Sequence, residues 1–232
     1  HIGQGTILLN FFNRIVLDEV DRMLDMGFIT DVESILSKVS KSRQSLFFSA
    51  TMDKKIESLI KRFGNDPVTV STREGNTADG VEQNVVYYSG ASEKIDKLHD
   101  ILIGVGCTKT IIFDETKRSV EKLGRELHSR GFKVDYIHGD KSQAQRARAI
   151  KQLKSDEINV LVATDVAARG IDVPDVSHVI NYSTPASYED YVHRIGRTAR
   201  AGKTGFALTF LGAETKSAAK TRSPRYTEPR LQ

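Results

Sequence analysis

Three carboxylates follow a short apolar run near the start of the sequence. The apolar residues 15–17 are followed by Asp18 and Glu19, and Asp21 comes after one more apolar residue. If residues 15–17 form a buried strand, these side chains lie at its carboxyl end, where parallel α/β sheets bind their ligands. Carboxylates there can hold a metal ion and activate a water molecule. The sequence therefore predicts half of a catalytic site, whose usual partner is a glycine-rich phosphate loop.

Polar side chains also follow most of the other apolar runs. They are Ser49, Thr51, Asp114, Glu115, Thr116, His138, Gly139, Asp140, Thr164 and Asp165. Any one of them could merely cap the next helix or face the solvent. Together they predict that one edge of a sheet presents polar groups to a ligand.

A basic segment lies near the end of the chain, at residues 191–202. Its arginines recur every three residues, as Arg194, Arg197 and Arg200. A helix predicted near 187–200 would place neighbouring members of this series on one face, with His193 on the same side. That face either binds an anion such as phosphate or is a solvated basic surface, and spacing alone favours the two equally. Gly196 favours the anion slightly, because a glycine inside a helix costs about 1 kcal/mol relative to alanine and indicates a close backbone approach.

Strand-length apolar runs alternate with amphipathic, helix-length segments along most of the chain. The strands are expected at 14–19, 45–51, 84–89, 110–115, 133–140, 158–165, 177–183 and 205–211. Strands separated by helices pair in parallel through crossovers, so the fold class is α/β with a parallel sheet. Residues 72–81 are expected to form a linker. Residues 213–232 are expected to be a basic, disordered tail.

Composition limits the possible classes of function. The 232 residues carry a net charge of +4 with a pI near 9.1, which is compatible with a polyanionic partner. Cys107 is the only cysteine, so a disulfide within the chain is impossible and a zinc site is disfavoured. No run approaches the roughly 18 apolar residues of a membrane span, and no signal peptide is visible. We therefore expect a cytoplasmic location without a membrane partner.

Six segments in order resemble the motifs of a DEAD-box ATP-dependent RNA helicase of superfamily two. "VLDEVDRMLDMGF" (16–28) is similar to the Walker B motif, and "SAT" (49–51) to motif III. The other four are "IIFDETKR" (111–118), "HGDKSQAQR" (138–146), "ATDVAARGIDVP" (163–174) and "YVHRIGRTARAG" (191–202). The resemblance implies two RecA-like domains with ATP between them and RNA across both. Residues 1–71 would be the C-terminal part of the first domain and residues 82–212 the complete second domain.

The resemblance also implies a role for individual residues. Asp18 would hold Mg²⁺ through water, and Glu19 would orient or deprotonate the attacking water. Asp172 would bind the ribose, and Arg197 and Arg200 would act as arginine fingers on the γ-phosphate. Contacts to the RNA backbone would come from Gly139, Arg146 and Thr164. Coupling between the domains would involve Asp21, Ser49, Thr51 and His193.

The chain departs from the family pattern in three respects. Val20 stands where the family has alanine, and Ala199 stands where it usually has glycine between the two fingers. The phosphate loop and the adenine-recognising segment would belong before His1, so the chain resembles a fragment that is inactive alone. Two other functions remain open: a superfamily-two motor acting on DNA, and a non-enzymatic module that binds RNA or a partner.

Overall fold

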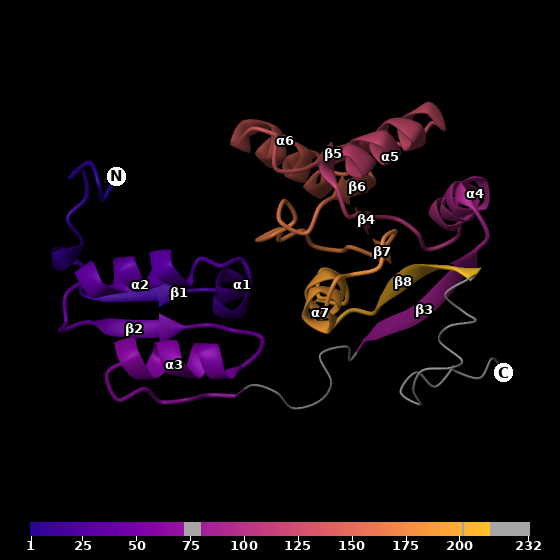
Figure 1. Ribbon diagram of the computed structural model, residues 1–232. Coiled ribbons are helices and arrows are strands. Elements are labelled where there is room, and N and C mark those ends of the chain that lie inside the picture. The colour runs from indigo at the N-terminus through magenta and orange to yellow at the C-terminus, as the bar shows by residue number, and fades with distance from the viewer. Residues whose placement is uncertain (72–79, 201, 214–232) are drawn as a thin grey trace. The chain divides into compact units, whose positions relative to one another are not determined.

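The computed structural model describes residues 1–71, 80–200 and 202–213, and the predicted linker 72–81 and tail 213–232 lie mostly outside these ranges. The chain divides into two compact units, His1–Thr72 and Arg73–Gln232 (Figure 1).

The first unit contains two parallel strands and three α-helices. In chain order they are the 3₁₀ turn η1 (Leu9–Phe11), β1 (Arg14–Leu17), α1 (Val20–Asp25), α2 (Ile29–Lys38), β2 (Gln44–Phe47) and α3 (Lys54–Phe63). β1 and β2 pair in register, with Leu17 opposite Phe47. Alternate strand residues such as Ile15 and Leu17 pack with apolar residues of all three helices, whereas Val16 on the opposite face is exposed. The carboxyl ends of both strands therefore meet at one edge.

The second unit is built on a six-stranded, entirely parallel sheet with the strand order β3-β8-β7-β4-β6-β5. The strands are β3 (Val81–Tyr88), β4 (Thr110–Phe113), β5 (Val134–Ile137), β6 (Val160–Ala163), β7 (His178–Asn181) and β8 (Gly205–Gly212). The helices are α4 (Ala91–Leu102), α5 (Lys117–Ser129), α6 (Gln143–Lys154) and α7 (Tyr188–Ile195). The predicted α/β class and parallel pairing are confirmed.

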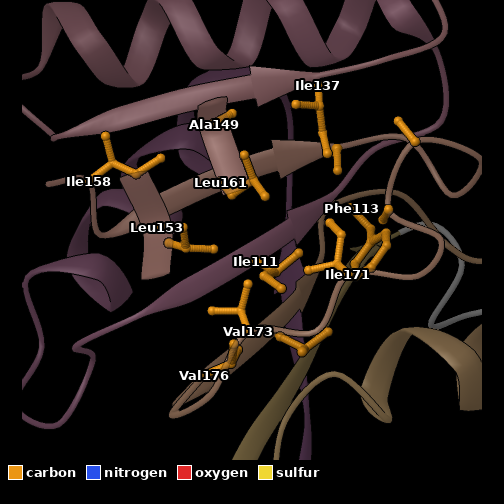
Figure 2. Packing of buried hydrophobic residues seen from close by; sticks show 14 residues of the cluster. Ile111, Phe113, Ile137, Ala149, Leu153, Ile158, Leu161, Ile171, Val173 and Val176 are labelled. Atoms are coloured by element: carbon orange, nitrogen blue, oxygen red, sulfur yellow. The ribbon is translucent and has the colours of Figure 1, made fainter. Parts of the chain in front are cut away.

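Both faces of this sheet are covered because side chains alternate along each strand. Ile111 and Phe113 of β4 point into one apolar core, which includes Leu153 of α6 and is drawn in Figure 2. Ile112 points into the opposite core with apolar residues of α4 and α5. The central strands are apolar throughout for this reason, and polar side chains are confined to their ends.

Two helices of the second unit begin at polar caps, and one of these caps, Thr116, is among the polar residues that the sequence places after a strand. The Thr116 hydroxyl accepts a hydrogen bond from the Ser119 amide at the start of α5, and Ser142 caps α6 in the same way with Gln145. Both are reciprocal capping boxes, which stabilise a helix terminus by satisfying two amides at once. Thr116 therefore has a structural role.

The predicted helix over 187–200 is wrong at its carboxyl end. α7 begins after Ser187 and ends at Ile195, with Gly196 as its C-cap. Arg197 and Arg200 lie beyond the helix, so they do not share a helical face with Arg194. Gly196 terminates the helix and is not in its interior.

Candidate functional site

In the first unit, the segment after β1 holds the carboxylates in a tight turn. The exposed Asp18 accepts a hydrogen bond at Oδ1 from the Glu19 amide, at 2.9 Å. Glu19 has φ = 53° and ψ = 48°, the left-handed region, and forms the N-cap of α1. A non-glycine residue there costs on the order of 1–3 kcal/mol, and such strain often occurs at functional sites. The turn presents adjacent carboxylates at the end of the strand.

Asp21 joins this turn to the segment after β2. Its side chain is buried, and Oδ2 accepts hydrogen bonds from the amides of Ala50 (3.0 Å) and Thr51 (2.9 Å) and from the Thr51 hydroxyl (3.2 Å). The Asp21 amide donates to Ser49 Oγ at 3.3 Å. The structure thus brings together Asp21, Ser49 and Thr51, which sequence reasoning grouped. Their proposed coupling role stays a prediction.

Val20, at the family's alanine position, is completely buried, and its amide donates to the Phe48 carbonyl oxygen at 3.0 Å. Its side chain packs with Leu17 and Leu24 in the core of the first unit. The extra bulk therefore fills the core beneath the turn.

In the second unit, Arg194 has a structural role that the predicted arginine stripe did not anticipate. Its guanidinium is 3% exposed and binds both carboxylate oxygens of Asp165, at 2.7 and 2.8 Å. Nη1 also donates to Asn181 Oδ1 (3.2 Å) and to the Ser183 carbonyl oxygen (2.8 Å). The guanidinium lies 5.2 Å from the centre of the Phe113 ring. Arg194 therefore fastens α7 to the ends of β4, β6 and β7, and the prediction of three arginines on one face is wrong.

Arg197 and Arg200 lie in the turn after α7, close to the segment after β6. Arg197 Nη1 donates to the Ile171 carbonyl oxygen at 3.0 Å. Arg200 donates to the Gly196 carbonyl oxygen (2.8 Å) and forms an ion pair with Asp172 Oδ1 (3.0 Å). The proposed ribose ligand and one proposed finger are thus in direct contact. The Asp172 side chain is 83% exposed and can reach a ligand from the solvent side.

Two further residues complete this turn. Ala199, at the family's glycine position, has φ = 53°, a conformation that favours glycine. The methyl group of Ala199 makes this backbone conformation less favourable than it would be with a glycine at the same position. His193, the proposed coupling residue, is half-buried near the end of α7.

The proposed RNA-contacting residues lie on two adjacent loops and on α6 of the second unit. β5 and β6 are neighbours, and the Thr164 amide donates to the Ile137 carbonyl oxygen at 3.3 Å. Gly139 follows β5, is exposed, and has open space where a Cβ would stand. Arg146 reaches the same region from α6, where Nη2 donates to the Ala167 carbonyl oxygen at 3.0 Å. The three residues therefore share one edge of the sheet.

The loop that contains Gly139 is held by its neighbours on both sides. The buried His138 ring accepts a hydrogen bond at Nδ1 from the Asp140 amide, at 3.3 Å, and stacks on Tyr136. Lys117, in the first turn of α5, forms an ion pair of 2.7 Å with Asp140 and lowers the pKa of that carboxyl. The loop is therefore held in one conformation, with its glycine facing outward.

Sequence reasoning missed two polar residues at the same edge. Asn181 is completely buried at the end of β7, accepts from Arg194 and donates to Thr209 Oγ1 at 3.0 Å. Tyr182 follows it, and burial, together with the negative charge of Asp114, raises the pKa of Tyr182 to about 12. The only sequence signal for either was the polar end of an apolar run.

The carboxylates of the first unit fit a magnesium ion shared with a nucleotide. Among residues 1–71, 80–200 and 202–213, no group of three or more His, Cys, Asp or Glu side chains could enclose a metal ion. Magnesium at phosphate sites is instead held by one or two carboxylates and the phosphates themselves. Asp18 is exposed and offers that kind of ligand. In the part of the chain that the structure describes, no helix has the length and apolar character needed to span a bilayer.

Two family models match the chain in the same order as the two units. Residues 2–59 match the DEAD/DEAH box helicase model, and residues 93–202 match the helicase conserved C-terminal domain. These matches and the parallel sheet define the class, a superfamily-two helicase.

Individual relatives narrow the class to one family. The DEAD-box ATP-dependent RNA helicase CshA of Bacillus subtilis is 44% identical over the whole chain, which spans 48% of that protein. A solved structure of the E. coli DEAD-box protein SrmB bound to a regulator of ribonuclease activity is 34% identical, with a TM-score of 0.55. The match covers 64% of this chain and 96% of that one.

S. cerevisiae Dbp5 bound to RNA and ADP BeF3 gives a TM-score of 0.79 at 31% identity, over 95% of this chain and 59% of that one. The chain belongs to the DEAD-box RNA helicase family. It spans about half the length of the curated relatives it matches.

Proposed function

We propose that the chain is part of an ATP-dependent RNA helicase, in which RNA-stimulated ATP hydrolysis is coupled to the separation of RNA strands. Residues 1–71 would belong to the first RecA-like domain and residues 82–212 would form the second. The observation that carries the proposal is the Asp21 network, which joins the segment after β1 to the "SAT" segment after β2. The network supports the proposal because it connects the segment that resembles the Walker B motif, which contains Asp18 and Glu19, with the segment that resembles motif III.

ATP hydrolysis needs a positioned water molecule and neutralisation of the charge on the phosphates. Glu19 would orient or deprotonate the water. Its left-handed backbone conformation forms the turn at the carboxyl end of β1, next to Asp18. Asp18 would hold a hydrated Mg²⁺, which when bound supplies positive charge to the phosphate oxygens. Arg197 and Arg200 would add charge at the γ-phosphate, and Asp172 would bind the ribose. Arg200 must leave Asp172 to do so, because the two now form an ion pair.

The 232 residues alone are expected to show negligible ATP turnover. The sequence contains no Gly-x-x-x-x-Gly-Lys-Ser/Thr segment, whose amides and lysine hold the phosphates in this class of site. The test compares RNA-stimulated ATPase of this chain with that of a longer protein that carries such a segment upstream. In the longer protein, Glu19→Gln should abolish turnover. Helicase-level turnover by the 232 residues would refute the expected inactivity, and an unchanged rate with Glu19→Gln would refute its assigned role.

RNA is the proposed nucleic-acid partner, held at the edge formed by Gly139, Arg146 and Thr164. Side chains and amides at such an edge contact the phosphates and sugars, which carry no base identity. Arg146→Ala and Thr164→Ala should each weaken binding of a labelled single-stranded RNA to the chain. RNA binding that survives both substitutions would count against this edge, and equal ATPase stimulation of the longer protein by DNA would favour the motor acting on DNA. The cytoplasmic location stays a prediction.

A further inference from the structure

The outer face of α6 carries positive charge that no acidic residue of the helix balances. The helix contains Arg146, Arg148, Lys151 and Lys154 but neither aspartate nor glutamate. Every other described α-helix contains at least one acidic residue. In α5, for example, Glu121 pairs with Arg125 one turn later. Like charges three or four residues apart destabilise a helix by about 0.2–0.5 kcal/mol per pair, so the charge pattern of α6 opposes its own stability.

Helix geometry separates these cations into two groups. Ala149 and Leu153 are buried against the sheet, and Arg146 is half-buried beside them. At about 100° per residue, Arg148 lies roughly 160° around the helix from Arg146. Arg148, Lys151 and Lys154 are all exposed, and among the described residues none of them has an acidic partner. Lys151 and Lys154 lie about 140° and 80° around the helix from Arg146, so the three cations form an exposed stripe beside the proposed RNA contact of Arg146.

The residues between these cations are small. Ala144 and Ala147 lie on the same exposed face as Arg148 and Lys151. The face is therefore flat between its charged side chains, so that a phosphate backbone can approach it closely. The dipole of the helix favours cations in its last turn, which accounts in part for Lys151 and Lys154. It does not account for Arg148 or for the missing acidic residues.

The stripe continues directly from the proposed RNA edge. Ser142, the N-cap of α6, comes three residues after Gly139, and the helix runs back along the side of the second unit next to β5 (Figure 1). From Ser142 to Lys154 the helix rises about 18 Å, roughly the length of five nucleotides of a stacked strand. We propose that the stripe Arg148, Lys151 and Lys154 contacts three phosphates within roughly the next five nucleotides of the RNA strand that contacts Gly139.

This inference rests on the proposed function and concerns a separate surface, so the two can fail separately. Each phosphate contact to a single strand changes the slope of log K against log salt by about 0.7, so the loss of three contacts should flatten it by about 2. If the plots of log K against log salt for the parent and the variant intersect near 1 M salt, the RNA affinity of the variant at 0.1 M salt should be on the order of 100-fold lower than that of the parent.

The experiment uses the whole chain with the triple variant Arg148→Gln/Lys151→Gln/Lys154→Gln and labelled single-stranded RNAs of increasing length. The parent should gain affinity as the RNA is lengthened by about five nucleotides beyond the shortest that binds, and the variant should not. The matched control is Lys54→Gln/Lys55→Gln/Lys61→Gln, which removes the same charge from exposed positions of α3. It should keep both the length dependence and the salt slope.

A charge-preserving variant, Arg148→Lys/Lys151→Arg/Lys154→Arg, should behave as the parent, which separates a phosphate contact from a structural role. If the triple glutamine variant keeps the salt slope while Arg146→Ala weakens binding, the stripe is refuted and the proposed edge stands. If the parent chain binds no RNA, both are refuted. If the two glutamine variants flatten the slope equally, the effect is general charge and the stripe is refuted.

Discussion

Replacing Arg194 with alanine should severely destabilise the second unit. The Arg194 guanidinium contacts groups at the ends of three strands and so connects them to α7. The substitution removes two bonds to Asp165 and one each to Asn181 and Ser183. Asp165, with 28% of its side chain exposed, would keep its charge without a partner, and the buried Asn181 oxygen would lose a donor.

The magnitude follows from the burial of the pair. Removing one partner of a buried ion pair typically costs about 3–5 kcal/mol, and partial solvation of Asp165 places the expected loss near the lower end, at about 3 kcal/mol. For a unit of this size that corresponds to a decrease in Tm of roughly 6–12 °C. Arg194→Lys keeps the charge but loses the planar two-point contact, so it should fall between the parent and Arg194→Ala.

Urea unfolding of the whole chain, followed by far-UV circular dichroism, measures the effect, since the chain lacks tryptophan. The matched control is Arg125→Ala, whose ion pair with Glu121 lies on the surface of α5. Its unfolding midpoint should equal that of the parent, because such pairs contribute little. A midpoint for Arg194→Ala no lower than that of Arg125→Ala would refute the reasoning. It would indicate that the contact between Arg194 and Asp165 contributes no more than a surface ion pair.

Three other substitutions test the second unit. Ala199→Gly should raise the free energy of unfolding by about 0.5–1 kcal/mol, because relief of the left-handed backbone exceeds the entropic cost of glycine; an unchanged urea midpoint would contradict this. Gly124→Ala in α5 should lower the free energy of unfolding by about 1–3 kcal/mol, although alanine has the better helix propensity, because the new Cβ would lie 2.6 Å from the Tyr136 ring. A stabilised variant would contradict the close packing of Gly124 against this ring. The folded-state pKa of Tyr182, about 12, lies above its unfolded value near 10, so up to about 2 kcal/mol of stability should be lost as pH rises from 10 to 12. Tyr182→Phe should remove that part of the loss, and an identical pH profile would count against the shifted pKa.

The strands and the polar edge followed from the sequence because both depend on local pattern. A run such as 111–113 is apolar at every position only when both of its faces are buried, and the next residue, Asp114, already marks the edge. The grouping of Asp21 with Ser49 and Thr51 came from the family resemblance. The contact itself forms because β1 and β2 pair in register, which brings their ends together.

The errors concern contacts between residues far apart in the sequence. A three-residue spacing places Arg194, Arg197 and Arg200 on one face only if the helix continues, and Gly196 ends it. Spacing also cannot indicate that Arg194 points inward, because its partner Asp165 lies 29 residues earlier, in the turn after β6. Buried polar side chains are determined by such distant partners, and no local periodicity reports them.

The Asp21 network allows a local test of the first unit. Oδ2 accepts from the amides of Ala50 and Thr51, while Oδ1 accepts from the Arg22 amide at 3.0 Å. Both carboxylate oxygens therefore face donors. An asparagine is neutral and must turn its NH₂ group toward the donors on one side. In Asp21→Asn every hydrogen bond of this side chain therefore loses its charge assistance, and a hydrogen bond to a charged group is worth about 1.5–3 kcal/mol.

Amide hydrogen exchange should show this loss at the bonds themselves. The amides of Ala50 and Thr51 should exchange roughly 10–150 times faster in Asp21→Asn if they open locally, the factor that corresponds to that energy. Asp31→Asn, an exposed aspartate in the first turn of α2, is the matched control and should leave both rates unchanged. If both amides keep their parent rates in Asp21→Asn, Asp21 does not hold the "SAT" segment. The link between the carboxylate turn and the segment after β2 would then have to run through Ser49 and the Val20 amide instead.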